Sequence, residues 1–238
     1  MEFYVGTSGW AYPWNEGRNL GWYVANSGLN AIELNASFYR YPYSSMIKSW
    51  SLNGNSLRWV IKVNRLITHI HRFSTETLQQ FQRFRSLFAP IETITDFFLF
   101  QTPASLAPED ADKIETFFKK TELETKFALE VRNLNWFTDK WAEWATKVGI
   151  TLVSVDAPTL PRKIFKTTNV VYMRMHGRTA WYRHDYSVEE LKEVVEGIRK
   201  LKPEKAYIFF NNNHAMLENA RQLFNIIREA GNTEQVLG

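Results

Sequence analysis

The chain has 238 residues, of which 45% are hydrophobic and 23% are charged, a composition typical of a globular protein with one sizeable core. Its formal net charge of +4 is compatible with an anionic ligand but is too small for a lysine-rich nucleic-acid-binding arm. The absence of cysteine excludes disulfides, zinc–thiolate sites, iron–sulfur clusters and thiol nucleophiles within the chain.

The first residues show no cationic segment followed by an apolar one, and no apolar run approaches the length of a membrane span. We therefore expect a cytoplasmic protein with no membrane association. Nine tryptophans and an aromatic content of 15% indicate ring-lined surfaces or an aromatic-rich core.

Eight short runs rich in Val, Ile, Phe, Leu and Tyr alternate along the chain with amphipathic stretches. The runs show little polar alternation, as expected for strands that are covered on both faces. Strands are predicted at 3–10, 31–40, 58–65, 97–103, 127–133, 151–158, 170–177 and 206–213. Helices are predicted at 74–88, 108–120, 138–149, 187–201 and 214–231.

Alternation of strands and helices predicts a parallel sheet, and eight strands in this length predict an α/β fold of the (β/α)8 TIM-barrel type. No GxGxxG motif follows the first strand, which argues against a dinucleotide-binding fold. Segment 158–169, after the sixth strand, contains two prolines and no helical period, so we expect an irregular connection there. No linker divides the chain, and residues 1–238 are predicted to form a single domain.

Polar residues follow the apolar part of most of these strands. In a (β/α)8 barrel the strands end at one mouth, where active sites lie, and side chains two residues apart share a face. The candidates for catalysis are Glu33, Glu130 and His176. The candidates for ligand binding are Lys62, Arg132, Arg174, Asn35, Asp156 and Asn211, with Trp10, Tyr39 and Trp136 as aromatic residues at the entrance.

Each of these residues also has a structural interpretation. Glu130 and Arg132 can pair with each other as a structural ion pair, and a lone histidine such as His176 is often a hydrogen-bonded structural residue. Asn211 belongs to a run of three asparagines that can cap the last helix. The density of titratable groups in one mouth nevertheless favours a functional site, because neighbouring charges in a partly dry cleft shift one another's pKa values.

The motifs along the chain resemble one known family. GTSGWAYPW, ELNASFYRYP, VIKVNRLITH, FQTPAS, ALEVRNLNW, VDAP, YMRMHG and FNNNHAMLENA occur in the order seen in the YecE-like family, also called domain of unknown function 72. The resemblance covers nearly the whole chain and implies a TIM-barrel-like fold, but it supplies no reaction. Asn213 stands where members commonly have an aspartate, which removes a carboxylate from that position.

Three functional hypotheses follow. The favoured one is an enzyme for an anionic ligand such as a phosphorylated sugar, a nucleotide or a nucleic-acid phosphate. In it Lys62, Arg132 and Arg174 hold the anion, and Glu130 or Glu33 moves a proton with His176. The second is a metal-dependent hydrolase or nuclease-like barrel, with Glu33, Glu130, Asp156 and His176 as ligands. The third is a non-catalytic nucleic-acid-binding protein. The sequence requires no cofactor, allows a divalent metal and leaves the oligomeric state open.

Overall fold

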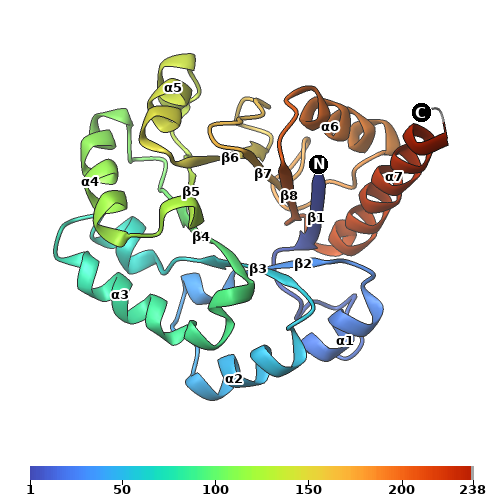
Figure 1. Ribbon diagram of the computed structural model, residues 1–238, viewed down its shortest axis with the longest axis horizontal. Coiled ribbons are helices and arrows are strands. Elements are labelled where there is room, and N and C mark those ends of the chain that lie inside the picture. The colour runs from blue at the N-terminus through green and yellow to red at the C-terminus, as the bar shows by residue number, and fades with distance from the viewer. Residues whose placement is uncertain (237–238) are drawn as a thin grey trace.

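The computed structural model describes residues 1–236, in which eight parallel strands close into a barrel in sequence order. The strands lie at the centre of the molecule and the helices surround them (Figure 1). β1 pairs with both β2 and β8, which closes the barrel. This confirms the predicted fold class. The strands are β1 (Glu2–Thr7), β2 (Ala31–Leu34), β3 (Arg58–Lys62), β4 (Thr95–Gln101), β5 (Phe127–Glu130), β6 (Thr151–Asp156), β7 (Val170–Met175) and β8 (Lys205–Phe210).

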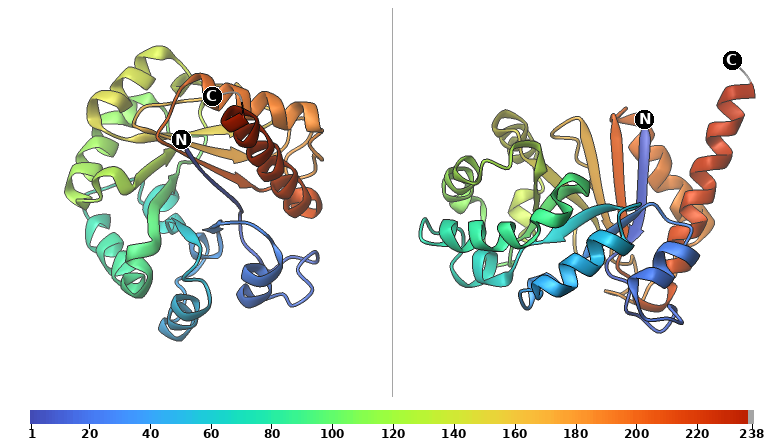
Figure 2. Two further views of the ribbon diagram at one scale, coloured as in Figure 1. Left: turned by 45° about the vertical axis from the view of Figure 1, so that its right-hand side comes forward. Right: turned by 60° about the horizontal axis from the view of Figure 1, so that its bottom comes forward.

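An outer ring of helices covers the barrel, as the two views of Figure 2 show. The ring is interrupted after β6, where residues 157–169 contain no helix, so the predicted irregular connection is confirmed. One helix between β2 and β3 was not predicted, because its sequence SSMIKSWSLN is rich in serine and has only two buried side chains. The helices are α1 (Leu20–Asn26), α2 (Ser44–Asn53), α3 (Thr77–Leu87), α4 (Ala111–Thr121), α5 (Asp139–Val148), α6 (Val188–Lys200) and α7 (Met216–Val236).

Local sequence signals set several helix ends. Ser187 and Glu190 form a reciprocal capping box at the start of α6, which satisfies two backbone donors that the first turn leaves free. Gly149 ends α5 with a left-handed φ of +89°, which glycine adopts without steric strain. The predicted end of the last helix near Gly231 is wrong, because α7 continues to Val236.

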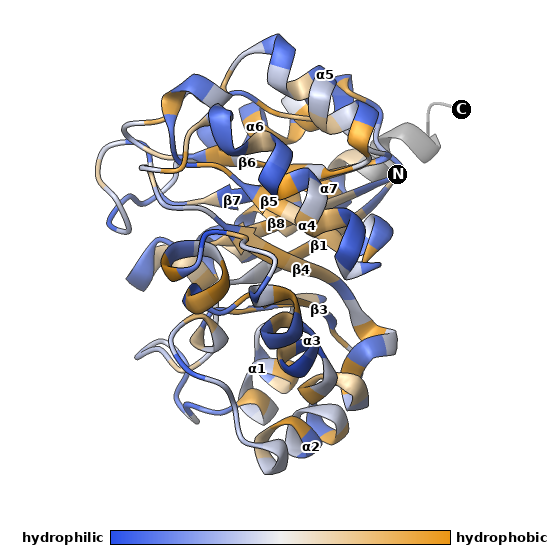
Figure 3. Ribbon diagram, turned by 90° about the vertical axis from the view of Figure 1, so that its left-hand side faces the viewer, coloured by the Kyte–Doolittle hydropathy of each residue, from blue (hydrophilic) through white to orange (hydrophobic). Residues whose placement is uncertain are grey.

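The hydrophobic core has two layers. One lies between the strands and the helices, and Figure 3 shows apolar strands at the centre with polar residues on the outer helix surfaces. The other fills the barrel and makes it a packed core rather than a pore. A ring stack of Tyr4 on Tyr207, 4.7 Å apart, belongs to this inner layer. The inner layer includes Ala31, Val60, Phe97, Leu99, Ala128, Val153, Val155, Tyr172, Tyr207 and Phe209.

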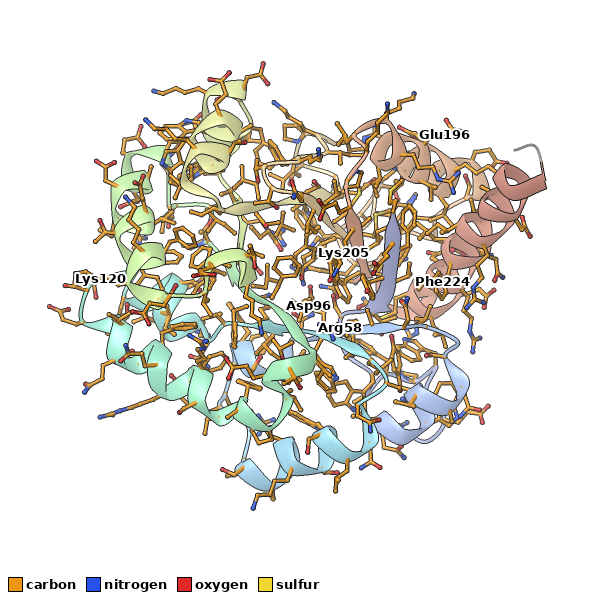
Figure 4. All side chains as sticks on the ribbon, in the orientation of Figure 1. Arg58, Asp96, Lys120, Glu196, Lys205 and Phe224 are labelled. Carbon is orange, nitrogen blue, oxygen red and sulfur yellow. The ribbon has the colours of Figure 1, made fainter. Side chains whose placement is uncertain are left out.

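The amino-terminal end of the barrel is closed by an ion pair. Arg58 and Asp96, at the starts of β3 and β4, lie beside each other near the centre of Figure 4. The hydroxyl of Tyr207 also donates to Asp96, at 2.9 Å. A ligand must therefore approach the interior from the opposite end, where the strands finish. No helix in the described part of the chain is long and apolar enough to cross a membrane.

Candidate functional site

Strand alternation places the charged side chains directly above the inner apolar layer. Ala128 of β5 belongs to the inner layer, and Glu130, two residues further on, faces the same way at the end of the strand. Val60 and Lys62 on β3 follow the same pattern. The barrel therefore carries apolar side chains in its lower part and charged ones at its carboxyl-terminal mouth.

Arg174, near the end of β7, is the centre of this charged layer and is fully buried. Its Nε and Nη2 donate to the two carboxylate oxygens of Glu33 on β2, at 2.9 and 2.6 Å. Its Nη1 donates to Glu130 on β5, at 2.5 Å. One guanidinium thus joins three strands that are not neighbours in the barrel, β2, β5 and β7. The burial of this arginine is offset by the two carboxylates, which raise its pKa.

Glu33 accepts hydrogen bonds on all sides. Besides Arg174, it accepts from the hydroxyls of Ser8 at 2.6 Å and Tyr172 at 2.5 Å. A carboxylate has about four lone-pair positions, and four donors already occupy those of Glu33. Glu33 was predicted as a catalytic residue, but these contacts favour an anchoring role for it, because no lone pair is left for a ligand proton.

Glu130 is also surrounded by cations. Arg132 donates through Nε to one oxygen, with which its Nη2 also forms an ion pair, and Arg174 donates to the other oxygen. Burial raises the pKa of the Glu130 carboxyl, but the two arginines outweigh it and hold this pKa below the usual range. A carboxylate held in its ionised form so firmly is a weak base. The geometry therefore favours Glu130 as the group that positions both arginines.

His176, which follows β7, is fully buried and neutral. Its Nε2 lies 3.1 Å from Nη2 of Arg132. Because arginine can only donate, Nε2 must accept, which places the ring proton on Nδ1. Nδ1 has no hydrogen-bond partner among the described residues. Burial and the guanidinium groups of Arg174 and Arg132 lower the pKa of His176 well below its usual value.

Lys62, at the end of β3, differs from the other charged residues of the layer because it has no direct ion-pair partner among the described residues, although Glu130 and Glu33 attract its charge from further away. It is 8% exposed, and its ammonium makes no hydrogen bond or ion pair with the side chains and backbone that the structure describes, which for side chains are residues 1–230. Its Nζ lies 4.3 Å from the centre of the Phe38 ring. The neighbouring residue Ser37 donates its hydroxyl to the Lys62 carbonyl at 2.6 Å, which fixes this segment beside β3. Burial and the neighbouring Arg174 lower the pKa of Lys62 from 10.5 to about 7.

The charges in the mouth do not balance. Glu33 and Glu130 carry two negative charges, whereas three basic side chains lie in the same layer. Arg132 stacks its guanidinium on the Trp181 ring at 4.7 Å and has an 11% exposed side chain. Its Nη1 makes none of the hydrogen bonds found in the described part of the chain. The exposed edge of this network is therefore cationic.

An aromatic pocket adjoins the charged layer. It has a volume of about 450 Å³ and is lined by Trp10, Asn35 and Tyr39, which the sequence also predicted as ligand contacts, and by Ser8 and Tyr12. Tyr39 is 70% exposed and stands at the rim.

Asn211, which directly follows β8, is half-buried. Its backbone N–H donates to the Met175 carbonyl at 2.8 Å. Its side chain makes no hydrogen bond to any residue whose side chain the structure describes (1–230), so its role in ligand binding stays a prediction.

Two predicted ligand contacts lie elsewhere. Asp156 is out of phase with Val155, which fills the barrel, so its carboxylate faces outward and accepts from Arg178 at 2.9 Å. Trp136 is fully buried, and its indole N–H donates to the Leu106 carbonyl at 3.1 Å. Neither side chain reaches the mouth, and both predictions are corrected by the structure.

One member of the site was not singled out from the sequence. Tyr172 lies two residues before Arg174 and faces the same way, so strand alternation could have indicated it. Phe38 lies in the short 3-10 helix η1 (Ala36–Phe38), and its place after a strand end marked it as an aromatic residue of the entrance. Its contact with the Lys62 ammonium was not predicted, because no sequence pattern indicates it.

A metal site receives no support from these side chains. No group of three or more His, Asp or Glu residues in the described range is arranged to hold an ion. Glu33 and Glu130 are occupied by arginines, and Asp156 points away from both. The residues predicted as metal ligands therefore do not fit that role.

Residues 4–236 match the model of a family described as protein of unknown function DUF72. Comparison with curated protein sequences finds no match. A DUF72 family protein from Thermotoga maritima superposes with a TM-score of 0.82 at 26% identity, over 96% of this chain and 100% of that chain. A DUF72 family protein from Enterococcus faecalis gives 0.83 at 20% identity, over 95% of each chain.

A more distant structure shares the fold alone. The 3-keto-D-glucoside 4-epimerase from E. coli has a TM-score of 0.59 at 9% identity, over 96% of this chain and 99% of that chain. At this identity the comparison supports the barrel architecture and carries no information on the reaction.

Proposed function

Because the chain belongs to the DUF72 family, whose description names no activity, we propose a function from its own site: an enzyme that binds a small anionic ligand at the carboxyl-terminal mouth of the barrel. The observation that carries this proposal is the unpaired ammonium of Lys62. A buried cation without a counterion is costly, and an anionic ligand would supply the missing charge.

Arg132 is the second contact for the anion. Its Nε and Nη2 are held by Glu130, which leaves the Nη1 edge of the planar guanidinium for a ligand oxygen. The Trp181 ring covers the face of the guanidinium and limits its movement. Arg174 is occupied by both glutamates, so it contributes to the positive potential rather than to direct contact.

The depth of the site limits the kind of anion. Lys62 is 8% exposed and the Arg132 side chain 11% exposed, so only the end of a ligand can reach both groups. A terminal phosphate or carboxylate fits this geometry better than the backbone of a nucleic acid, which would lie across the surface. The alternative of a non-catalytic nucleic-acid-binding protein is therefore less well supported.

Lys62 is also the group suited to move a proton. With a pKa of about 7 it can gain or lose a proton near neutral pH, which is the property required of a general acid or base. Glu130, whose pKa is lowered, and Glu33, which is fully hydrogen-bonded, take the supporting roles. The proton transfer that the sequence suggested for the glutamates is thus reassigned to Lys62.

Thermal unfolding with sulfate tests the proposal, because the charge of sulfate is constant between pH 6 and pH 9. Sulfate should raise the unfolding midpoint more at pH 6, where Lys62 is charged, than at pH 9. Sodium chloride at equal ionic strength controls for screening, and a Lys62→Met variant controls for the general stabilisation by sulfate. An equal shift in the wild type and the variant at both pH values would contradict the proposal.

A further inference from the structure

The aromatic pocket beside the charged layer is a second feature of the mouth that anion binding does not explain. It lies between the segment after β1 and the segment after β2, where Gly9 has a left-handed φ of +102° and turns the chain toward Trp10. Its volume of about 450 Å³ falls in the range of small-molecule sites. We call it the ring pocket, after its lining by Trp10, Tyr12, Tyr39 and Trp50.

The walls of the ring pocket are held rigidly. Trp10 meets Trp50 edge-on at 5.5 Å and Trp59 at 5.8 Å, and Tyr12 stacks on Trp14 at 5.6 Å. Trp50 is 7% exposed and forms a deep wall, whereas Tyr39 forms an open one. Rigid aromatic walls favour a flat ring, because stacking needs no further ordering of the side chains.

Two chains of contacts link the ring pocket to the cations. Asn35, which lines the pocket, accepts from Nη2 of Arg174 at 3.4 Å. The Tyr39 ring lies 5.1 Å from the Phe38 ring, on which the Lys62 ammonium rests. These contacts place one residue between the ring pocket and each cation, Asn35 on the way to Arg174 and Phe38 on the way to Lys62.

Other cavities lack this connection. One lies on α5 around Glu143, another lies between α4 and the segment 73–78, and a third lies between α6 and α7 and is lined by Glu196, which Figure 4 labels on α6. None of the three is lined by a residue of the charged layer, by Asn35 or by Tyr39.

We propose that the ring pocket binds a flat ring that belongs to the same ligand as the anionic group at Lys62. This inference rests on the proposed function and defines its ligand class: a phosphate or carboxylate joined to a planar ring by a short link. The rim residue Tyr39 stacks on the ring, and Asn35 and Ser8 offer polar contacts to its edge.

Calorimetric titration with phenyl phosphate and methyl phosphate tests the inference, because both are phosphate monoesters and only one of them carries a ring. Phenyl phosphate should bind the wild type about 10-fold more tightly than methyl phosphate does. A Tyr39→Ala variant should lose about 5-fold of the affinity for phenyl phosphate and none for methyl phosphate. Tyr43→Ala is the matched control, because Tyr43 is 76% exposed, makes no side-chain cap bond and does not line the pocket.

The outcomes separate this inference from the proposed function. Equal affinities for the two esters would overturn the proposal that the ring pocket binds a ring of the ligand, and would leave the proposal of anion binding intact. Binding of phenol without binding of either ester would overturn anion binding and, with it, the inference that one ligand carries both the ring and the anionic group. An equal loss of affinity for both esters in Tyr39→Ala would also overturn the assignment of the ring to this pocket.

Discussion

Replacement of Lys62 by methionine should make the protein more stable while removing its proposed function. Methionine keeps an unbranched side chain of similar length but carries no charge. Residues retained for function at the expense of stability are expected to show this opposite pair of effects. A lysine that only supports the fold would lose stability on substitution.

The magnitude follows from the pKa of the buried ammonium, which burial and Arg174 lower from 10.5 to about 7. At about 1.4 kcal/mol per pH unit, its charge costs roughly 5 kcal/mol of unfolding free energy below pH 7. Lys62→Met also loses the contact between the ammonium and the Phe38 ring, which reduces the expected gain in unfolding free energy by roughly 1 kcal/mol. We expect Lys62→Met to be about 3 to 4 kcal/mol more stable at pH 6.

The stability difference between the wild type and Lys62→Met should decrease as the pH rises. Because the folded pKa lies below the unfolded one, the unfolded chain binds more protons between pH 7 and pH 10.5. The stability of the wild type therefore rises with pH across this window, relative to the variant. The difference between the two proteins should fall below about 1 kcal/mol at pH 10.

Urea unfolding at pH 6 and pH 10 measures this difference. The matched control is Lys120→Met, since Lys120 is exposed on α4 at the edge of the molecule (Figure 4). The control should change the unfolding free energy by less than about 0.5 kcal/mol at either pH. A destabilised Lys62→Met variant, or a gain that is the same at both pH values, would refute the argument.

Three further predictions concern the charged layer. Glu130→Gln leaves two buried guanidinium groups short of a countercharge and should lower the unfolding free energy, measured by urea unfolding, by about 3 to 5 kcal/mol. A loss below about 1 kcal/mol would contradict the network. Tyr172→Phe removes a hydroxyl that donates to Glu33 and should lower the unfolding free energy by about 1 to 3 kcal/mol. An unchanged urea midpoint would count against this hydrogen bond. Binding of an anion at pH 8 should raise the pKa of Lys62 and take up roughly one proton, seen as a dependence of the calorimetric heat on buffer ionisation enthalpy. Binding without proton uptake would exclude Lys62 from the contact.

Much of the fold could be predicted because strand patterns and helix signals are local. The irregular connection after β6 was recognised from its two prolines, and the α6 capping box from Ser187 and Glu190. Strand alternation also predicted that Glu130 and Arg174 lie at the mouth, where the structure has them. Helix α2 was missed, because a serine-rich segment with two buried side chains carries little periodic signal.

The errors in the site have physical causes. β6 is buried on both faces, so its sequence does not show which side of the strand Asp156 occupies. Trp136 belongs to the core because Trp141 on α5 packs against it at 5.0 Å, a contact that depends on where the helix docks. The lack of a counterion for Lys62 depends on pairing across the barrel, where Glu33 and Arg174 are 141 positions apart. Cytoplasmic location stays a prediction from the sequence.

The central claim is that Lys62 holds an anionic group in the barrel mouth. Calorimetric titration of methyl phosphate at pH 6.5 into the wild type and Lys62→Met tests it most directly. The account predicts binding to the wild type and a loss of at least about 10-fold in the variant, which corresponds to about 1.4 kcal/mol for one charged contact. Equal affinity of both proteins for methyl phosphate would contradict the claim.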